Sequence, residues 1–228
     1  MDLSEFNIQQ INNEYFRMII FGSSGSGKTY FTLHKLLPEL KKRYHQVFLI
    51  SPSYLKSQYE QVIPRHCLTH IDCHKFKKGY ELKDVLKMIQ ATIEKTKIGR
   101  DQTGHTMYKY KTLIIFDDAL HETVDQELSN SFAHFRHYQT SLIFLSQHTK
   151  KICSPMMLGN TNFIVMFNMK GQSKLDCINM LREYTEGTSE KEQKSIANSV
   201  YNKWIVGTVG NTYNCLFCDG VGNNLFYL

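Results

Sequence analysis

The chain has 228 residues, of which 42% are hydrophobic and 21% charged, a balance that excludes a wholly disordered chain and suits a single α/β domain. No apolar run approaches the roughly 20 residues that cross a bilayer, and the N-terminus has no secretory pattern, so we expect no membrane span and reduced thiols in a reducing, intracellular compartment. The formal net charge of +6 suits a polyanionic partner but identifies none.

The predicted elements alternate between strand and helix along most of the chain. The apolar run Arg17–Phe21 is typical of a strand buried on both faces of a parallel sheet. Leucines at helical spacing then predict a helix with a basic C-terminal end, which Pro38 is expected to kink. Further strands are predicted at 47–50, 69–72, 112–116, 142–145 and 163–167, with 69–72 the weakest, and further helices at 82–93 and about 122–137. This order predicts a mainly parallel central sheet with a five-stranded core, flanked by helices.

One segment between these elements has no periodicity. Residues 97–111 carry glycine, charge and tyrosine and are predicted to form a mobile surface loop. Its basic and aromatic side chains either grip a nucleic-acid backbone by charge and stacking or are merely solvated. The side chains concerned are Lys95, Lys97, Arg100, Tyr108, Lys109, Tyr110 and Lys111.

The pattern changes after Lys170. Two short helices are predicted, the second opened by the capping box Ser189-x-x-Glu192. Two strands at 203–208 and 212–217 follow, joined through the turn Gly210-Asn211. We therefore predict a core over residues 1–170 and a small C-terminal appendage of helices and a β-hairpin over residues 171–228, packed on that core.

A glycine-rich segment joins the first strand to the first helix and matches the P-loop pattern G-x-x-x-x-G-K-[ST]. Small residues let successive main-chain N–H groups approach phosphate oxygens, and the helix N-terminus adds positive potential there. Lys28 is predicted to lie between the β- and γ-phosphates, and the Thr29 hydroxyl to be a ligand of Mg²⁺. We predict that ATP is bound by Gly22, Ser23, Ser24, Gly25, Ser26, Gly27, Lys28, Thr29 and Tyr30.

Two adjacent carboxylates follow the apolar residues 113–116, at the end of a predicted strand where ligands of open α/β sheets bind. Asp117 is predicted to hold Mg²⁺ through water, and Asp118 to accept a proton from the attacking water or to orient it. The alternative is a helix N-cap pair in front of residues 119–122, which would be the better interpretation without a P-loop. With the P-loop, the pair is a Walker B motif.

Two polar side chains at the ends of predicted elements are further catalytic candidates. Gln147 ends the strand after the Walker B strand and is a candidate sensor of the γ-phosphate, although polar residues often end strands facing solvent. Arg136 ends the intervening helix, where it either favours the helix dipole or reaches the nucleotide of a neighbouring subunit as an arginine finger.

Cysteines and histidines cluster at residues 67–74, and Cys215 with Cys218 forms a C-x-x-C, which raises the question of a zinc site. However, Cys215 and Cys218 fall on a predicted strand, where positions i and i+3 face opposite sides. Scattered structural roles are therefore the better interpretation.

Taken together, these motifs resemble the genome-packaging ATPases of large DNA viruses, which belong to the FtsK/HerA group of RecA-like, ASCE-type P-loop motors. The resemblance spans roughly residues 15–170 and is carried by FGSSGSGKT, LIIFDD, the segment Phe135-Arg136-His137-Tyr138 with Ser141, and FLSQ at 144–147. It is most specific where an arginine-histidine helix end precedes a strand that closes in glutamine.

The resemblance implies a RecA-like core that hydrolyses ATP with Mg²⁺ at the interfaces of a homo-oligomeric ring, a hexamer or pentamer, threading double-stranded DNA. It also implies that the protein acts at the virion or the viral assembly site in the host cytoplasm, with capsid or portal-vertex proteins as partners. Cellular members have large additional domains and often carry glutamate at the position of Asp118. The chain departs from them in both respects and resembles a compact viral motor.

The leading hypothesis is an ATP-hydrolysing motor that packages a viral genome into a preformed capsid. A RecA-like helicase or replication ATPase would carry the same nucleotide chemistry. A P-loop nucleoside or nucleotide kinase has a similar size, but the paired acids, Gln147 and the lack of a basic lid cluster favour water as the acceptor. A switch that binds nucleotide without turnover is the remaining alternative.

Overall fold

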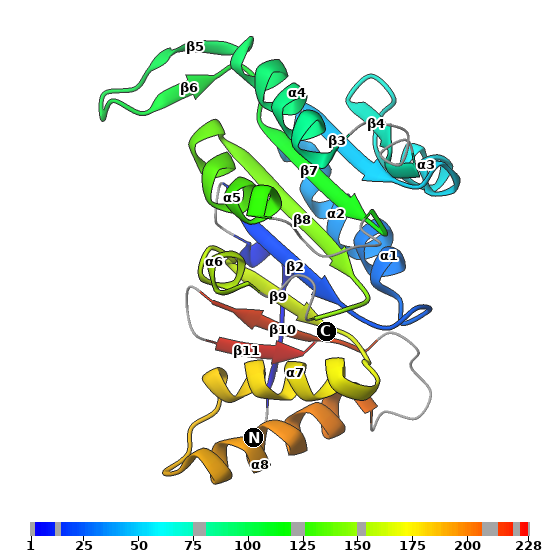
Figure 1. The fold of residues 1–228 in the computed structure, drawn as a ribbon, viewed down its shortest axis with the longest axis vertical. Coiled ribbons are helices and arrows are strands. Elements are labelled where there is room, and N and C mark those ends of the chain that lie inside the picture. The colour runs from blue at the N-terminus through cyan, green and yellow to red at the C-terminus, as the bar shows by residue number, and fades with distance from the viewer. Residues whose placement is uncertain are drawn as a thin grey trace.

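A single large sheet forms the centre of the molecule, and helices cover both of its faces (Figure 1). The computed structural model describes residues 3–11, 15–74, 81–119, 126–149, 154–206, 214–220 and 224–227. The strands of the sheet within these residues are β1 Ser4–Glu5, β2 Arg17–Phe21, β3 Gln46–Ser51, β4 Leu68–Asp72, β7 Thr112–Asp117, β8 Thr140–Ser146, β9 Phe163–Met166, β10 Leu216–Asp219 and β11 Asn224–Tyr227. They lie in the order β1-β11-β10-β9-β2-β8-β7-β3-β4.

The strands from β9 to β4 in this order are all parallel, which makes six parallel strands among the described residues rather than the five predicted. Strands β2, β7, β8 and β9 are buried throughout because helices lie on both sides, and this explains their continuous apolar runs. β4 is the edge strand and only half-buried, which is why its sequence is a weaker signal. The predicted α/β fold with a mainly parallel sheet is confirmed.

One face of the sheet is covered by the helix that follows the P-loop and by α3 Ser53–Glu60. The first of these consists of α1 Lys28–Phe31, a π-helical turn at Thr32–Leu36, α2 Leu37–Leu40 and a 3-10 turn at Lys41–Arg43. Because Pro38 has no N–H and displaces the carbonyl four residues earlier, the expected kink takes the form of this wider π-helical turn.

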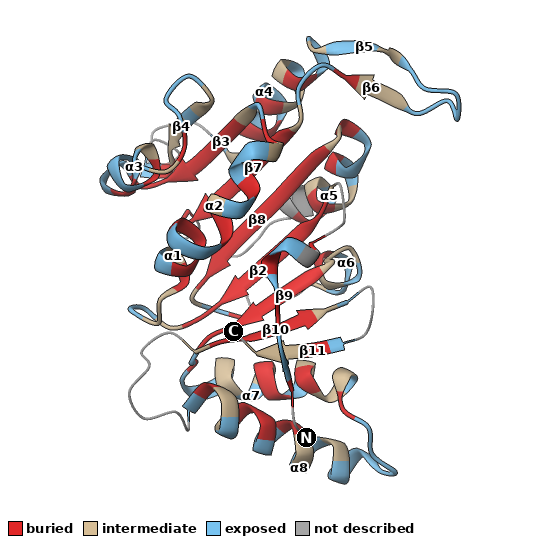
Figure 2. Cartoon of the chain, turned by 180° about the vertical axis from the view of Figure 1, so that it is seen from behind, coloured by how far each residue is buried: buried red, intermediate tan, exposed pale blue. Residues whose placement is uncertain are grey.

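The opposite face is covered by α4 Leu82–Glu94, α5 Gln126–His134, α6 Pro155–Gly159, α7 Gly171–Leu181 and α8 Glu190–Tyr201. Figure 2 shows that the central strands of the main sheet are buried while the outer surfaces of the helices are exposed. The helix predicted at 82–93 is confirmed. The one predicted from residue 122 ends in a 3-10 turn, η5 Phe135–Tyr138, and its first residues, up to 125, lie outside the described ones. No helix in the described ranges has the length and apolar character that crossing a membrane requires.

The loop predicted at residues 97–111 is wrong, because this segment contains an antiparallel pair, β5 Lys97–Arg100 and β6 Thr106–Tyr108, which forms a sheet of its own. The turn between them is built on Asp101, whose carboxylate accepts hydrogen bonds from the N–H groups of Thr103 and His105. A β-bulge between Lys97 and Gly99 breaks the alternation of side chains. For this reason the sequence shows no strand pattern here.

The two helices predicted after Lys170 are present, and the Ser189 hydroxyl caps the second by accepting a hydrogen bond from the N–H of Glu192. The strand predicted at 203–208 is wrong: Asn202–Val206 continues α8 as a π-helical turn, and the predicted turn at 210–211 lies outside the described residues.

The C-terminal hairpin instead consists of β10 and β11, and β10 pairs with β9 of the main sheet. Helices α7 and α8 bury residues in the same hydrophobic core as the parallel strands. The boundary placed at residue 170 stays a prediction. The residues after position 170 belong to the same sheet and the same hydrophobic core as the residues before it.

Phe217 of β10 offers a test of this shared core. Its side chain is fully buried, stacks on Phe6 with 3.6 Å between ring centroids and contacts Phe163 at 5.2 Å. We expect Phe217→Ala to lower the free energy of unfolding by about 3–5 kcal/mol in urea denaturation, because the cavity joins three separate segments. Leu175→Ala, at a half-exposed position on α7, should change it by less than about 0.5 kcal/mol. Equal losses in the two variants would contradict a core that includes β10.

Candidate nucleotide-binding site

A cavity lies at the carboxyl ends of β2, β7 and β8, the edge of a parallel sheet where ligands bind. The P-loop, the Walker B acids, the end of β8 and the start of α3 meet there. The cavity is lined by Ser24, Gly25, Lys28, Thr29, Tyr54, Leu55, Asp117, Asp118, Leu145 and Gln147. Motifs that are far apart in the sequence therefore form one site.

The P-loop needs glycine at positions where its turn is tightest. Gly27, directly before α1, has a φ of 100°, in the left-handed region that favours glycine. A Cβ at Gly22 would lie 2.8 Å from the Cβ of Phe167, and that backbone-proximal atom cannot move aside. The N–H of Gly22 donates to the carbonyl of Ser146 at 3.1 Å, so the loop is fixed to the end of β8.

Lys28 is buried inside the loop that it follows. Its Nζ donates to the carbonyl oxygens of Gly22 at 2.7 Å and Ser23 at 3.1 Å. Burial lowers the pKa of Lys28, and the carboxylates of Asp117 and Asp118 oppose this effect. The ammonium group is thus held among main-chain carbonyls, close to the two acids.

Asp117 is the last residue of β7 and is 2% exposed. Its Oδ2 accepts hydrogen bonds from the Thr29 hydroxyl at 3.0 Å and from the Tyr59 hydroxyl at 2.9 Å. Burial raises the pKa of Asp117, and these two hydrogen bonds act in the opposite direction. The two predicted metal ligands, Thr29 and Asp117, are therefore in direct contact.

Asp118 has a φ of 51°, a left-handed conformation that is uncommon outside glycine and turns its side chain away from the line of the strand. Its Oδ1 accepts a hydrogen bond from Gln147 Nε2 at 3.2 Å, and its Oδ2 accepts one from the Tyr54 hydroxyl at 3.0 Å. Burial, followed by the hydrogen bond to Asp118, raises the pKa of Tyr54 to about 12, so this hydroxyl stays protonated. The two adjacent acids thus occupy different environments, Asp117 deeply buried and Asp118 half-buried.

These groups fit a nucleoside triphosphate and its magnesium ion. Within the described residues the buried Ser26 hydroxyl has no hydrogen-bond partner, and the helix after the loop begins with N–H groups that no intrahelical carbonyl accepts. Lys28 would add a positive charge toward the phosphates, and the oxygens of Thr29 and Asp117 are the ligand type that Mg²⁺ prefers. The ion, when bound, would neutralise charge on the phosphate oxygens.

Among the predicted site residues, Gly22, Ser23, Ser26 and Gly27 form the P-loop without lining the cavity. Tyr30 and Arg136 lie outside both the P-loop and the cavity lining. Tyr30 is 45% exposed and packs on the ring of His34, and its role in nucleotide binding stays a prediction. Arg136 is exposed on η5, directly before β8, whereas Gln147 follows the end of the same strand. The seven residues of β8 span roughly 23 Å, so Arg136 lies at the opposite edge of the sheet from the nucleotide site of its own chain.

Sequence reasoning missed the two tyrosines of α3. This helix begins at Ser53, directly after β3, and β3 is the neighbour of β7 in the sheet. Its residues Tyr54 and Tyr59 therefore reach Asp118 and Asp117. The sequence does show tyrosines shortly after the β3 strand. They can be assigned to the site only when it is known that β3 lies beside the Walker B strand.

The cysteines and histidines considered for zinc are dispersed. Cys215 and Cys218 are buried on opposite faces of the sheet, as the strand geometry predicted. Cys73 belongs to one hydrophobic core, whereas Cys67 packs against the other. Among the described residues no three histidine, cysteine, aspartate or glutamate side chains gather in a metal-binding arrangement.

The family model described as "Poxvirus A32 protein" matches residues 3–220 of this chain. The chain belongs to the poxvirus A32 protein family. Among A32 relatives, the DNA packaging protein OPG160 of Vaccinia virus (strain Copenhagen) is 29% identical over 198 residues, which cover 86% of this chain and 68% of that protein. The monkeypox virus protein of the same name is also 29% identical over 198 residues, but only 61% of its length is covered.

Solved structures of viral packaging proteins share the fold of this A32 family member. The genome packaging NTPase B204 from Sulfolobus turreted icosahedral virus 2, in complex with AMPPCP, matches with a TM-score of 0.59 at 17% identity, over 94% of this chain and 97% of that one. B204 from Sulfolobus turreted icosahedral virus, described as a DNA-packaging ATPase, matches with a TM-score of 0.60 at 15% identity, over 95% and 98%. These likenesses confirm the predicted α/β fold with a mainly parallel sheet, and together with family membership they confirm the resemblance to viral genome-packaging ATPases.

Tyr59→Phe tests whether the hydrogen bond to Asp117 orients a metal ligand. We expect magnesium-dependent nucleotide affinity to fall by about 10- to 100-fold, because a ligand's outer partner is lost while the ring still fills its space. A magnesium titration with a fluorescent ATP analogue measures the effect, and nucleotide affinity without magnesium should not change. Tyr54→Phe is the matched control, since Tyr54 contacts Asp118 instead. If both variants weakened magnesium binding equally, the hydrogen bond from Tyr59 to Asp117 would not be what orients the metal ligand.

Proposed function

We propose that this A32 family member is an ATP-hydrolysing motor that moves double-stranded DNA into a preformed viral capsid. The observation that carries the proposal is the single cavity in which the P-loop, the contact between Asp117 and Thr29, and the contact between Asp118 and Gln147 converge. The A32 relatives named as DNA packaging proteins, and the similar fold of a genome packaging NTPase, support it.

The catalytic roles follow from the environments of the side chains. Lys28 and the P-loop N–H groups bind the β- and γ-phosphates and stabilise the negative charge of the transferring phosphoryl group. Asp117 and Thr29 hold the magnesium ion. Asp118, less buried and held by Gln147, orients the attacking water and accepts its proton. The left-handed backbone at Asp118 re-aims a side chain one carbon shorter than the glutamate common in cellular motors.

Arg136 acts in trans in this proposal. It lies at the amino end of β8, too far to reach the nucleotide of its own chain, and it is exposed. A head-to-tail ring would place this edge of one subunit against the open cavity of the next. The guanidinium would then stabilise charge on the neighbour's γ-phosphate, as arginine fingers do. A hexamer or pentamer satisfies this geometry.

The proposed partners are duplex DNA in the channel of the ring and the capsid or portal-vertex proteins that would anchor it. The place of action is the virion assembly site in the host cytoplasm. These assignments rest on the packaging role of the A32 relatives. The helicase, kinase and switch alternatives gain no specific support from the described residues.

The proposed motor function predicts how ATP hydrolysis responds to duplex DNA and to substitution of the active-site residues. Phosphate release from ATP should be slow for the free chain and rise when duplex DNA is added. Asp118→Asn should lower turnover by about 100-fold or more while nucleotide still binds, because only proton acceptance is lost. Lys28→Ala, the control for the site itself, should lose both binding and turnover. Full DNA-stimulated turnover in Asp118→Asn would rule out Asp118 as the base.

The role of Arg136 predicts complementation between inactive variants. Arg136→Ala keeps an intact pocket, and Lys28→Ala keeps an intact arginine, so each ring alone should hydrolyse little ATP. Mixed rings should regain activity, because about a quarter of their head-to-tail interfaces join an intact pocket to an intact arginine. Phosphate release measured across mixing ratios tests this. A mixture no more active than its components would show that Arg136 does not act across an interface.

A further inference from the structure

A two-stranded arm leads directly into the Walker B strand. Figure 1 shows β5 and β6 extending beyond the main sheet, and Figure 2 shows that most of the arm's surface is exposed. We call residues 95–111 the cationic arm. It contains five lysine or arginine residues and a single acid, so it holds most of the formal net charge of +6 of the whole chain.

The cationic arm is built as a defined structure. At its tip Asp101 accepts hydrogen bonds from the Thr103 hydroxyl at 2.7 Å and from the N–H of His105 at 2.8 Å. At its base the N–H of Lys109 donates to the carbonyl of Thr96 at 2.8 Å. The single acid is therefore occupied in shaping the turn, and its hydrogen bonds, above all the one from Thr103, lower the pKa of Asp101. A merely solvated loop would need neither feature.

The base of the arm is anchored to the body of the protein. The Tyr108 ring packs against Tyr138 with 5.8 Å between centroids, and the Tyr138 hydroxyl accepts a hydrogen bond from Gln90 of α4 at 2.7 Å. The N–H of Tyr108 donates to the side-chain carbonyl of Gln139 at 3.3 Å. Tyr108 is therefore buried and cannot stack on a base, whereas Tyr110 is exposed beneath the Lys109 ammonium. The base of the arm therefore contacts η5 directly and α4 through Tyr138.

Two cations on the first strand of the arm have no ion-pair partner among the described residues. Lys97 and Arg100 are exposed on β5, and neither side chain makes a hydrogen bond or an ion pair with any residue that the structure describes. His105 of the arm is close enough to His137 of η5 for its charge to act on that imidazole. Burial, followed by the charges of Arg136, His134, Arg17 and His105, lowers the pKa of His137. Exposed Lys97 and Arg100 of the arm thus add to the exposed positive charge of Arg136 on η5, which β6 contacts.

We propose that the cationic arm binds the phosphate backbone of duplex DNA. This inference rests on the proposed function, which supplies the DNA partner. A two-stranded β-ribbon fits the major groove of B-DNA, where phosphates border both sides, and exposed lysine and arginine neutralise them with release of counterions. Because β6 leads into β7, the base of the arm and Asp117 lie at opposite ends of the same buried strand, roughly 20 Å apart. DNA position and the metal site would be mechanically linked.

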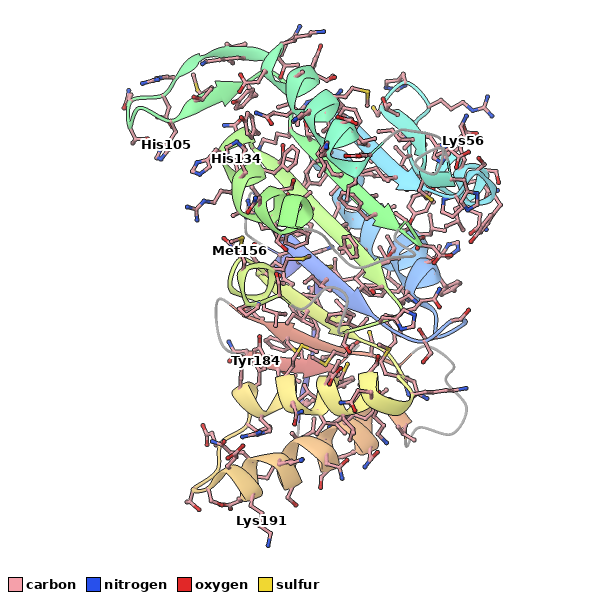
Figure 3. All side chains as sticks on the ribbon, in the orientation of Figure 1. Lys56, His105, His134, Met156, Tyr184 and Lys191 are labelled. Carbon is pink, nitrogen blue, oxygen red and sulfur yellow. The ribbon has the colours of Figure 1, made fainter. Side chains whose placement is uncertain are left out.

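The test removes charge without removing bulk. Lys97→Gln with Arg100→Gln in the full chain is compared with Lys191→Gln and Lys194→Gln, which lose the same charge from exposed positions on α8, at the far end of the molecule (Figure 3 labels Lys191). Fluorescence anisotropy measures affinity for a labelled duplex of about thirty base pairs between about 50 and 200 mM sodium chloride. We expect the arm variant to bind at least about tenfold more weakly near 100 mM, with a salt slope smaller by about 1.8.

The α8 variant should bind as the wild type does, and ATP hydrolysis without DNA should be unchanged in both. An arm variant with wild-type affinity and slope would overturn the proposal while leaving the DNA motor intact. So would an equal loss in the α8 variant, which would mark general charge as the cause. Loss of subunit assembly with an unchanged salt slope would assign the arm to a protein contact instead. If the wild type bound no duplex at all, both the proposed DNA partner and the proposed DNA-binding role of the arm would be contradicted.

Discussion

The nucleotide site depends on the burial of one carboxylate. Asp117 ends a strand that is buried along its whole length, and a charge in that position is costly unless hydrogen bonds or a cation offset it. Thr29 from the P-loop helix and Tyr59 from α3 supply those hydrogen bonds. Three elements are thereby tied together at the carboxyl edge of the sheet. The position of the metal ligand is a consequence of the fold, because none of these partners is near Asp117 in the sequence.

The neighbouring acid illustrates how two identical side chains take different tasks. Asp118 leaves the strand through a left-handed backbone conformation and meets Gln147 and Tyr54 instead of the buried partners of Asp117. Such a conformation is unfavourable for a residue with a side chain and persists where the surroundings hold it. A difference of environment, rather than of residue type, separates the proposed base from the proposed metal ligand.

The amino and carboxyl ends of the parallel strands carry different functional groups, and the strands connect them rigidly. β7 runs from the cationic arm to Asp117, and β8 runs from Arg136 to Gln147. In the proposed ring, each strand would connect a contact made outside its chain, with DNA or with a neighbour's nucleotide, to the chain's own active site. Close-packed strands are not easily compressed, so a displacement at one end of a strand would also move its other end.

Much of this protein could be determined from its sequence, because local patterns report local chemistry. The P-loop and Walker B acids follow from spacing and strand context, and continuous apolar runs identified β2, β7, β8 and β9 because helices bury both faces of these strands. The resemblance to viral packaging motors came from the same short segments.

Only the tertiary structure determined which residues distant in the chain are paired. The predicted hairpin was misplaced because β10 is specified by its pairing with β9, some fifty residues earlier, and the arm was taken for a loop because a bulge hides its alternation. Tyr54 and Tyr59 could not be assigned, since only the adjacency of β3 and β7 brings α3 to the two acids. Arg136 was a candidate from sequence, and only strand direction showed that it lies across the sheet from its own nucleotide site. Strand order and direction arise from non-local packing, which no short window of sequence contains.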